Sequence, residues 1–372
     1  MDRLRAIDQL LRSVPGARSE TLQLRMLLER EADVLCVAHA QRQPAAAALM
    51  RGEPPGPDDG GPSDEALFDA PLAHTAAMSC MAVWHGFVDL PAALAVGSTL
   101  VDPVFETACD AIVSGDADTL RALLTSQPAL ARARSPFAHH QTLLQHVSAN
   151  GIENSRQWQS PANAVELMTL LLDAGAEPDV RCDSYGGSTA LTLLVSSQHP
   201  AEAGVQAALV ERLCQGGARP DGPDDDGMPL CTAITSWYTA AIDALVRCGA
   251  RIDNLLFAAA VGDLARVERY FDAEGLLRPD ALSWGRSHAL ARVGQPRVTL
   301  QERHILEYAL HWAAKHRRRQ VVKLLLKKAP DFRVKEPLWG CSLLEAAHAG
   351  GDAECIAAIQ PHFDEQARPR AR

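Results

Sequence analysis

The chain has 372 residues, of which 47% are hydrophobic, 22% are charged and 5% are aromatic, and its formal net charge is −10. This composition excludes a largely disordered or fibrous chain, and the charge argues against a binder of nucleic acid or acidic membranes along its whole length. No apolar run reaches the roughly 18 residues of a membrane-spanning helix, and charges interrupt the N-terminal stretch that a signal peptide keeps apolar. We therefore expect a cytoplasmic protein with reduced cysteines.

Residues 1–104 predict a helical region that differs from the rest of the chain. Apolar residues recur at helical spacing from Leu4 to Val14 and across residues 22–39, and a third helix is expected over residues 64–84. The sequence GEPPGPDDGGP at 52–62 predicts a flexible linker. These helices could cap the first unit of the array that follows or dock along its concave side, and the cap is the favoured interpretation.

From residue 105 onwards one pattern recurs, in which a short helix, a turn and a leucine-rich second helix precede a glycine-containing stop. The stops are plainest at DAGA (173–176), QGGA (215–218) and RCGA (247–250), where glycine suits the left-handed residue that ends a helix. The first helices are expected to begin near Glu106, Thr142, Thr189, Met228, Asp253, Tyr308 and Ser342. Helix pairs that recur in series along the chain predict a solenoid in which neighbouring units bury each other's apolar faces.

Two of these first helices resemble the ankyrin repeat family. MPLCTA at 228–233 and ALHWAA at 309–314 look like the family's TPLHxA signature, and VVKLLL at 321–326 looks like its second-helix core. Trp237 and Arg317 depart from the family, because they stand where it has glycine between the two helices.

The resemblance implies an all-α solenoid of about seven degenerate ankyrin repeats behind an α-helical N-terminal capping region. The array is expected over residues 105–363, with insertions near 152–161 and 272–303, and residues 364–372 are expected to form a disordered tail.

Two further segments resemble one group of bacterial ankyrin-repeat proteins. AVWHGFVDLP at 82–91 is similar to the R-E-H-G-F-x-S/D-W-P segment of that group, and LLQHVSANGIE at 143–153 is similar to its L-L-H-Y-V-A-A-N-G-V-E insertion. Gln145 and His146 replace the group's His-Tyr pair. The match indicates bacterial relatives and no particular activity.

The leading hypothesis is a non-catalytic module that binds another protein. Ankyrin arrays bind through hairpin tips and the inner-helix face, which form a concave strip, and aromatic side chains there suit interface anchors. Alignment on the motif gives the partner-binding candidates Gln145, His146, Thr232, Phe257, Trp312 and Glu345 on the inner face and Tyr185 and Trp339 on hairpins. For Trp312 and Phe257, packing against a neighbouring repeat or the N-terminal helices is the open alternative.

Two other functions stay open. Residues 139–156 are rich in His, Asn, Glu and Arg and could form an enzyme or small-ligand site, although a polar loop is favoured. Such a site requires its polar side chains to converge on one pocket, namely His139, His140, His146, Asn150, Glu153 and Arg156. Seven basic residues within 315–328 could contact nucleic acid, although a solvated face or a site for an acidic partner is favoured.

Cofactors and metals find no support in the motifs. The chain has no H-E-x-x-H, no C-x-x-C pair and no phosphate-binding G-x-x-x-x-G-K-[ST]. We therefore predict no catalytic residue, no cofactor, no metal site and no membrane partner.

Overall fold

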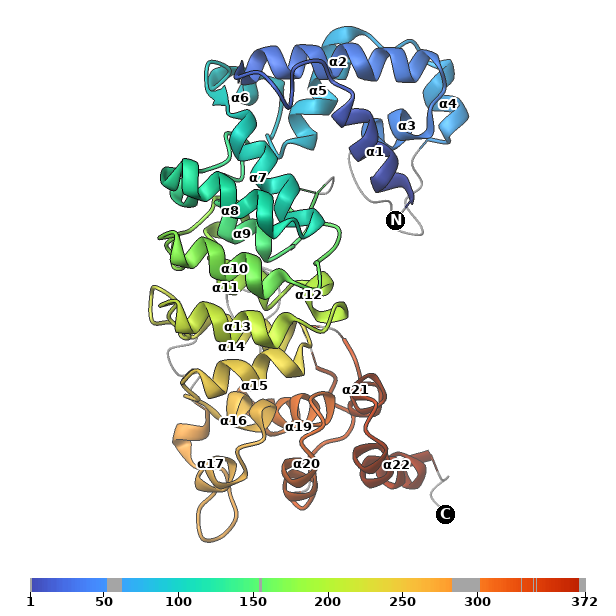
Figure 1. The fold of residues 1–372 in the computed structure, drawn as a ribbon. Helices are drawn as coiled ribbons and strands as arrows, with labels where there is room; N and C mark the ends of the chain where they lie inside the picture. The colour runs from blue at the N-terminus through green and yellow to red at the C-terminus, as the bar shows by residue number, and fades with distance from the viewer. Residues whose placement is uncertain are drawn as a thin grey trace. The chain divides into compact units, whose positions relative to one another are not determined.

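The computed structural model describes residues 2–51, 62–153, 156–282, 302–328, 330–336, 338 and 340–367. These residues are mostly helical and contain two strands of two residues each. The chain divides into two compact units, Met1–Gly217 and Ala218–Arg372, whose helices are traced in Figure 1. No described helix has both the length and the apolar composition that a bilayer crossing requires.

The first unit begins with a group of helices around their own apolar core. Its elements are α1 (Asp2–Arg12), β1 (Leu22–Gln23), α2 (Leu24–Ala40), α3 (Pro44–Arg51), α4 (Asp64–Asp69), α5 (His74–Trp84), α6 (Leu90–Ala95) and β2 (Leu100–Val101). The long α2 packs along α5, and Ile7, Leu28 and Met81 lie in this core. Phe137, from the loop after the first array helices, joins the same core, so this region is continuous with the start of the array.

Two details of this region differ from the expectation. Helix α3 has no counterpart in the predicted elements, and residues 64–84 form two helices instead of one. Helix α4 ends because Ala70 adopts ψ 137°, as the ring of the following Pro71 favours. The expected linker at 52–62 lies outside the described residues except for Pro62.

The remainder of the first unit is a stack of helix pairs. The pairs are α7 (Pro103–Ser114) with α8 (Ala117–Ser126), α9 (Leu143–Val147) with α10 (Ala164–Asp173), and α11 (Ala190–Leu194) with α13 (Gln206–Gln215), with α12 (Gln198–Glu202) between the last two. Helices α7, α9 and α11 pack in one row, and α8, α10 and α13 pack in a second. The 3-10 turns η1 (Pro128–Arg132) and η2 (Ser184–Gly186) lie between pairs.

The second unit is also built from helix pairs. Its pairs are α14 (Met228–Thr235) with α15 (Thr239–Arg247), α16 (Leu255–Val261) with α17 (Leu264–Arg269), α19 (Ile305–Lys315) with α20 (Arg319–Leu326), and α21 (Leu343–Gly350) with α22 (Ala353–Ala367). The short turns η3 (Pro279–Leu282) and η4 (Glu302–His304) flank part of the expected insertion, of which residues 283–301 lie outside the description. Helix α22 includes residues 364–367, which were expected to be disordered, and residues 368–372 are not described.

The helix boundaries follow the local chemistry that the sequence carries. Thr142 and Ser342 form capping boxes with the side chains three residues later, so α9 and α21 begin where expected. Gly175, Gly217 and Gly249 all have positive φ after a second helix, as the stop motifs predict. The all-α fold of serial helix pairs is therefore confirmed, whereas the number of true ankyrin repeats stays a prediction.

Two buried histidines make the second unit sensitive to acid. Burial lowers the pKa of His311 to about 4, and burial together with the charge of Arg318 lowers the pKa of His316 to about 3. The neutral ring of His316 already uses both nitrogens, which lie 3.0 Å from Thr239 Oγ1 and 3.2 Å from Ile234 O. A proton on Nδ1 would reverse the bond to Thr239, whose hydroxyl oxygen would then accept, and would place a charge in a buried site.

We expect the free energy of unfolding of the second unit to fall as the pH drops below about 6.5. The unfolded chain protonates both rings near that pH, whereas the folded unit resists protonation until the pH approaches the lowered pKa values. Stability that is complete above about pH 6.5 is thus lost as the pH falls, down to about pH 4 for His311 and about pH 3 for His316. His316→Gln should weaken this dependence by about one proton. Urea unfolding at pH 7, 6 and 5 measures it, and identical pH slopes in the two proteins would contradict the assignment.

Candidate functional site

Most of the predicted inner-face residues are buried. Gln145, His146, Phe257 and Trp312 are at most 2% exposed and Thr232 is 9% exposed, so the expectation of an exposed inner face is wrong for all five. Glu345 is exposed, and its carboxylate accepts the Ser342 N–H at the start of α21. Trp339 lies outside the described residues.

The physical reason is that neighbouring loops cover these positions. The Gln145 amide donates to the backbone oxygens of Val180 and Ser188 at 2.9 and 3.2 Å, so it ties α9 to the next hairpin. Trp312 donates from Nε1 to the buried Glu336 at 3.4 Å. The alternative of packing inside the array therefore describes Trp312, and it describes the fully buried Phe257 equally well.

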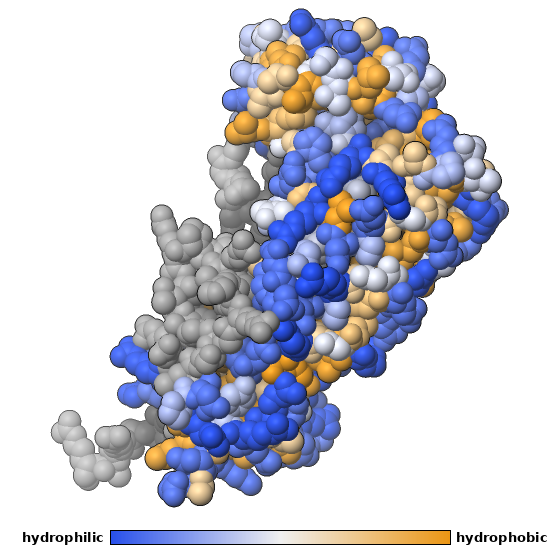
Figure 2. All heavy atoms as spheres, turned by 90° about the vertical axis from the view of Figure 1, so that its left-hand side faces the viewer, coloured by the Kyte–Doolittle hydropathy of each residue, from blue (hydrophilic) through white to orange (hydrophobic). Residues whose placement is uncertain are grey.

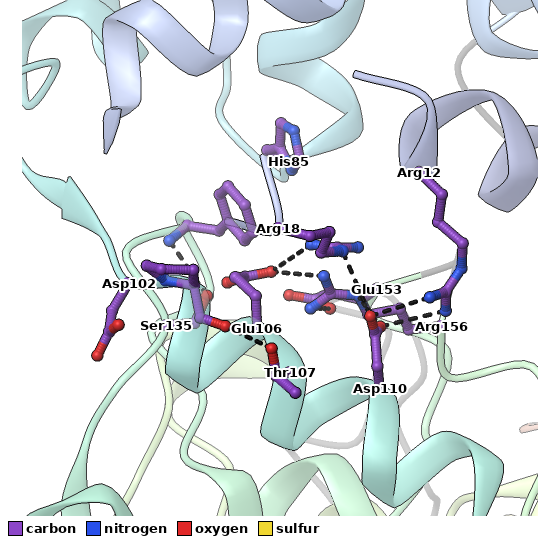
Figure 3. Close-up of polar contacts among 12 residues, drawn as sticks. Arg12, Arg18, His85, Asp102, Glu106, Thr107, Asp110, Ser135, Glu153 and Arg156 are labelled. Atoms are coloured by element: carbon purple, nitrogen blue, oxygen red, sulfur yellow. Dashed lines mark hydrogen bonds and ion pairs between the residues drawn. The ribbon is translucent and has the colours of Figure 1, made fainter. Parts of the chain in front are cut away.

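A charged junction, buried at Glu106 and Arg156, joins three segments of the first unit, as Figure 3 shows. Two carboxylates one turn apart on α7, Glu106 and Asp110, face arginines from the N-terminal region and from the 152–161 insertion. Arg18 lies 3.0 Å from Glu106, and Arg12 reaches Asp110 with two nitrogens at 3.0 and 3.2 Å. Arg156 contacts Glu106 at 2.5 Å. We will call these five residues the charged junction.

The charged junction continues into part of the predicted histidine cluster. Glu153 lies 2.9 Å from His139, 3.4 Å from His146 and 3.6 Å from Arg156. Burial opposes its ionisation, but His146 and the other cationic neighbours lower the pKa of Glu153 well below its usual value. The carboxylate is therefore ionised at neutral pH.

The two histidines respond to burial differently. Burial lowers the pKa of His139 despite its hydrogen bond to Glu153. Burial also opposes the charging of His146, yet its anionic surroundings raise the pKa of His146 well above the usual value. Burial raises the pKa of the adjacent Cys109 thiol and keeps it neutral, so Glu153 is the anion responsible. A buried neutral thiol is a poor nucleophile, which argues against Cys–His catalysis here.

The space at the charged junction is too small for a substrate. A cavity of about 30 Å³ is lined by Arg18, Glu106, Glu153 and Arg156 among others, which is room for about one water molecule. Arg18 Nε, Arg156 Nη1 and Glu106 Oε1 have no hydrogen-bond partner among the residues that the structure describes, although Arg18 Nε lies 3.3 Å from Asp110 Oδ2. A water there would find two donors and an acceptor. The rest of the predicted cluster points elsewhere: His140 pairs with Asp183, and Asn150 bonds to the α11 backbone.

A larger groove of about 320 Å³ lies beside α1 and α2 but offers no reactive group. Leu10, Val34 and Val37 form part of its apolar lining. Its charged side chains are already paired, since Arg30 contacts Glu20 at 3.0 Å and Asp33 contacts His74 at 3.1 Å. Other apolar side chains reach the surface around α6, and Figure 2 shows apolar spheres on the N-terminal region at the top of the view.

Tyr185 is a predicted candidate whose side chain the structure places in solvent. Tyr185 is 74% exposed and lies at the tip of the η2 turn. Its backbone is left-handed, with φ 50° and ψ 36°, and Gly186 and Gly187 that follow also have positive φ. The segment that leads into this turn is fixed by Arg134, whose Nη1 donates to the backbone oxygens of His140 and Arg181 at 3.1 and 2.9 Å.

The basic stretch 315–328 is largely neutralised by contacts inside the second unit. Arg318 pairs with Asp243 at 2.6 Å, and Arg319 pairs with Asp352 and Glu354 at 2.8 and 2.6 Å. The side chain of Arg317 donates to a backbone oxygen of α21, and Lys315 lies against an aromatic ring. This arrangement favours the interpretation of an internally paired face over a phosphate-binding patch.

One family model matches a segment of the chain. Residues 306–334, which cover most of α19 and all of α20, match the ankyrin repeat family model. The chain is similar to the human ASB11 ankyrin repeat domain, with 17% identity and a TM-score of 0.37 over 73% of this chain and 100% of that chain. It is also similar to the ankyrin repeat domain of Bcl-3, with 18% identity and a TM-score of 0.33 over 68% of this chain and 97% of that chain. No curated protein matches it.

The family match confirms the ankyrin resemblance of residues 306–334, which contain the motifs at 309–314 and 321–326. Ankyrin repeats are in general protein-interaction modules and are typically not enzymes. The bacterial relatives and the cytoplasmic location stay predictions.

Proposed function

We propose that this chain is a non-catalytic, cytoplasmic module that binds another protein through an exposed hairpin surface centred on Tyr185. The observation that carries the proposal is that Tyr185, a large aromatic residue, is exposed to solvent and has a strained, left-handed backbone conformation. A tyrosine at positive φ destabilises the fold by about 1 kcal/mol or more, so a requirement for stability alone would not retain tyrosine at this position. Tyrosine is a frequent interface anchor because it offers a large rigid contact area and a polar tip.

Glu345 is also exposed and fits the same proposal in a smaller role. Its carboxylate is already bonded to the Ser342 N–H, so it supplies complementarity instead of anchoring energy. The buried candidates Gln145, His146, Phe257 and Trp312 hold the array together, and a partner contacts them only if the covering loops move.

The enzyme alternative is not favoured by the charged junction. Its carboxylates and arginines pair with each other, and its cavity has room for about one water molecule. The adjacent Cys109 thiol is neutral. The junction instead fixes the N-terminal region and the insertion to α7, which supports a capping role for residues 1–104.

We expect Tyr185→Ala to abolish or strongly weaken capture of the partner without a loss of stability. The side chain makes little contact with its own chain, so only the interface loses area. The measurement is affinity capture from the native host with the full-length chain, followed by mass spectrometry of the proteins retained by the wild type and lost by the variant. Leu276→Ala is the matched control, because Leu276 is also an exposed apolar side chain.

Tyr185→Gly separates strain from function. Glycine adopts positive φ freely, so this variant should be more stable than Tyr185→Ala, by up to about 1 kcal/mol, and equally poor at capture. Unchanged capture by both Tyr185 variants would count against the η2 surface, and equal loss in Leu276→Ala would show that the effect is unspecific.

A further inference from the structure

Two turns of the second unit carry large side chains where comparable turns carry glycine. The turns that follow α7, α16 and α21 contain Gly115, Gly262 and Gly351, all with positive φ. The turns that follow α14 and α19 contain Trp237 with φ 72° and Arg317 with φ 62°, and both residues are exposed. A side chain is strained in this conformation, whereas glycine is not. Strain of this kind gathers at functional positions, so the two turns are candidates for an interaction surface.

One histidine brings these two turns together. His316, which directly precedes Arg317, lies 3.0 Å from Thr239 Oγ1 and 3.2 Å from Ile234 O. Ile234 and Thr239 flank Trp237 in the chain, so the turn after α19 is fixed against the turn after α14. Trp237 and Arg317 therefore belong to one surface of the second unit.

A nearly buried ammonium group lies against the indole. Lys315 is 8% exposed, and its Nζ lies 3.3 Å from the centroid of the Trp237 ring. Burial, and less strongly the charge of Arg317, lowers the pKa of Lys315 to about 8, so most of this amine is still charged at pH 7. Lys315 thus adds positive charge to the surface from behind the indole.

Arg317 presents the accessible cation. Its Nε donates to Gly350 O at 2.6 Å, which fixes the guanidinium and leaves both Nη groups without a hydrogen bond to the described residues. No described carboxylate pairs with Arg317 or with Lys315, whereas aspartates neutralise the next two arginines, Arg318 and Arg319. The open edge of a guanidinium matches the two oxygens of a carboxylate.

We propose that Trp237, Lys315 and Arg317 form an interaction surface for an acidic segment of a protein. Arg317 donates through its Nη groups to a carboxylate of that segment, and the indole of Trp237 packs against the apolar part of the same side chain. Nucleic acid fits this surface less well, because binding to a duplex rests on many phosphate contacts and few cations here lack a paired carboxylate. The surface is separate from the hairpin of Tyr185, so the two proposals are tested independently.

Fluorine NMR of the full-length chain labelled with 5-fluorotryptophan tests this proposal, with a hexaglutamate peptide as the probe. The chain has six tryptophans, and the Trp237 resonance is assigned by its loss in Trp237→Phe. We expect hexaglutamate at up to millimolar concentration to shift the Trp237 resonance in a saturable way, whereas hexalysine leaves it unchanged. The resonance of the buried Trp312 reports whether each variant is folded.

A matched pair of variants locates the contact. Arg317→Gly removes the guanidinium without strain, because glycine accepts the positive φ, and we expect it to raise the Kd for hexaglutamate about tenfold. Lys327→Ala removes an exposed cation of the same stretch and should leave the Kd within about twofold.

Three results would overturn the proposal. The first is a Trp237 resonance that hexaglutamate does not shift, and the second is a Kd that Arg317→Gly leaves unchanged in a folded chain. The third is a short DNA duplex that shifts the same resonance at lower concentration than hexaglutamate, because that result would assign the surface to nucleic acid.

Discussion

Replacement of Glu106 by glutamine is expected to lower the free energy of unfolding of the first unit by about 3–5 kcal/mol. Glu106 is 1% exposed and contacts Arg18 and Arg156. The neutral amide therefore takes from the buried Arg156 guanidinium the nearest of its carboxylates and leaves Asp110 at 3.4 Å and Glu153 at 3.6 Å. Hydrogen exchange resolved by peptide at increasing urea concentration measures this, because it reports each unit separately. Protection should fall in α7 and the N-terminal helices and stay unchanged in the second unit.

Two further variants show whether burial of the charge is the cause. Asp118→Asn breaks the exposed Asp118–Arg121 pair, and its expected effect is at most about 1 kcal/mol. Glu106→Met combined with Arg156→Met removes both buried charges and should cost less than Glu106→Gln alone. Equal losses for Glu106→Gln and Asp118→Asn would refute the assignment of the charged junction as the element that fixes the cap.

Replacement of Trp312 by alanine is expected to destabilise the second unit by about 3–5 kcal/mol. Trp312 is 1% exposed in α19, so alanine leaves a cavity and removes the N–H that bonds to the buried Glu336. The same peptide-resolved exchange measures the effect. The sequence alone predicts a different outcome for this variant, namely loss of the partner with the fold intact.

Leu276→Ala is the control within the same unit, since an exposed side chain should change stability by no more than about 0.5 kcal/mol. Trp312→Phe should fall between the two because it refills most of the cavity and loses only the hydrogen bond. Wild-type stability of Trp312→Ala together with lost partner capture would restore Trp312 as an interface anchor.

The local signals of the sequence were sufficient for the helix pairs. Capping residues such as Thr142 and Ser342, and glycines such as Gly175, act within one or two turns, so their effect can be read without tertiary information. Pro71 carried an equally local signal, and its break between α4 and α5 was predictable from the same rules.

The candidate site depended on contacts that no local pattern contains. His146 is covered because Glu153 and Arg156 fold back over α7. The arginines that pair with the carboxylates of α7, Arg12 and Arg18, come from about 90 residues before that helix. Periodicity identifies which face of a helix is apolar, but it does not say which distant segment covers a polar position. Tyr185 was predictable because a hairpin tip has no further layer to cover it.

The pairing of β1 with β2 has a consequence for how the chain folds. Leu22 pairs with Val101, so these two short strands close almost the whole N-terminal region into one loop. Closing a long loop carries an entropic cost before its contacts reward it, whereas each helix pair of the array joins residues close in sequence. We expect the helix pairs of the first unit to form early and the N-terminal region to close over α7 as the late, rate-limiting step of that unit's folding.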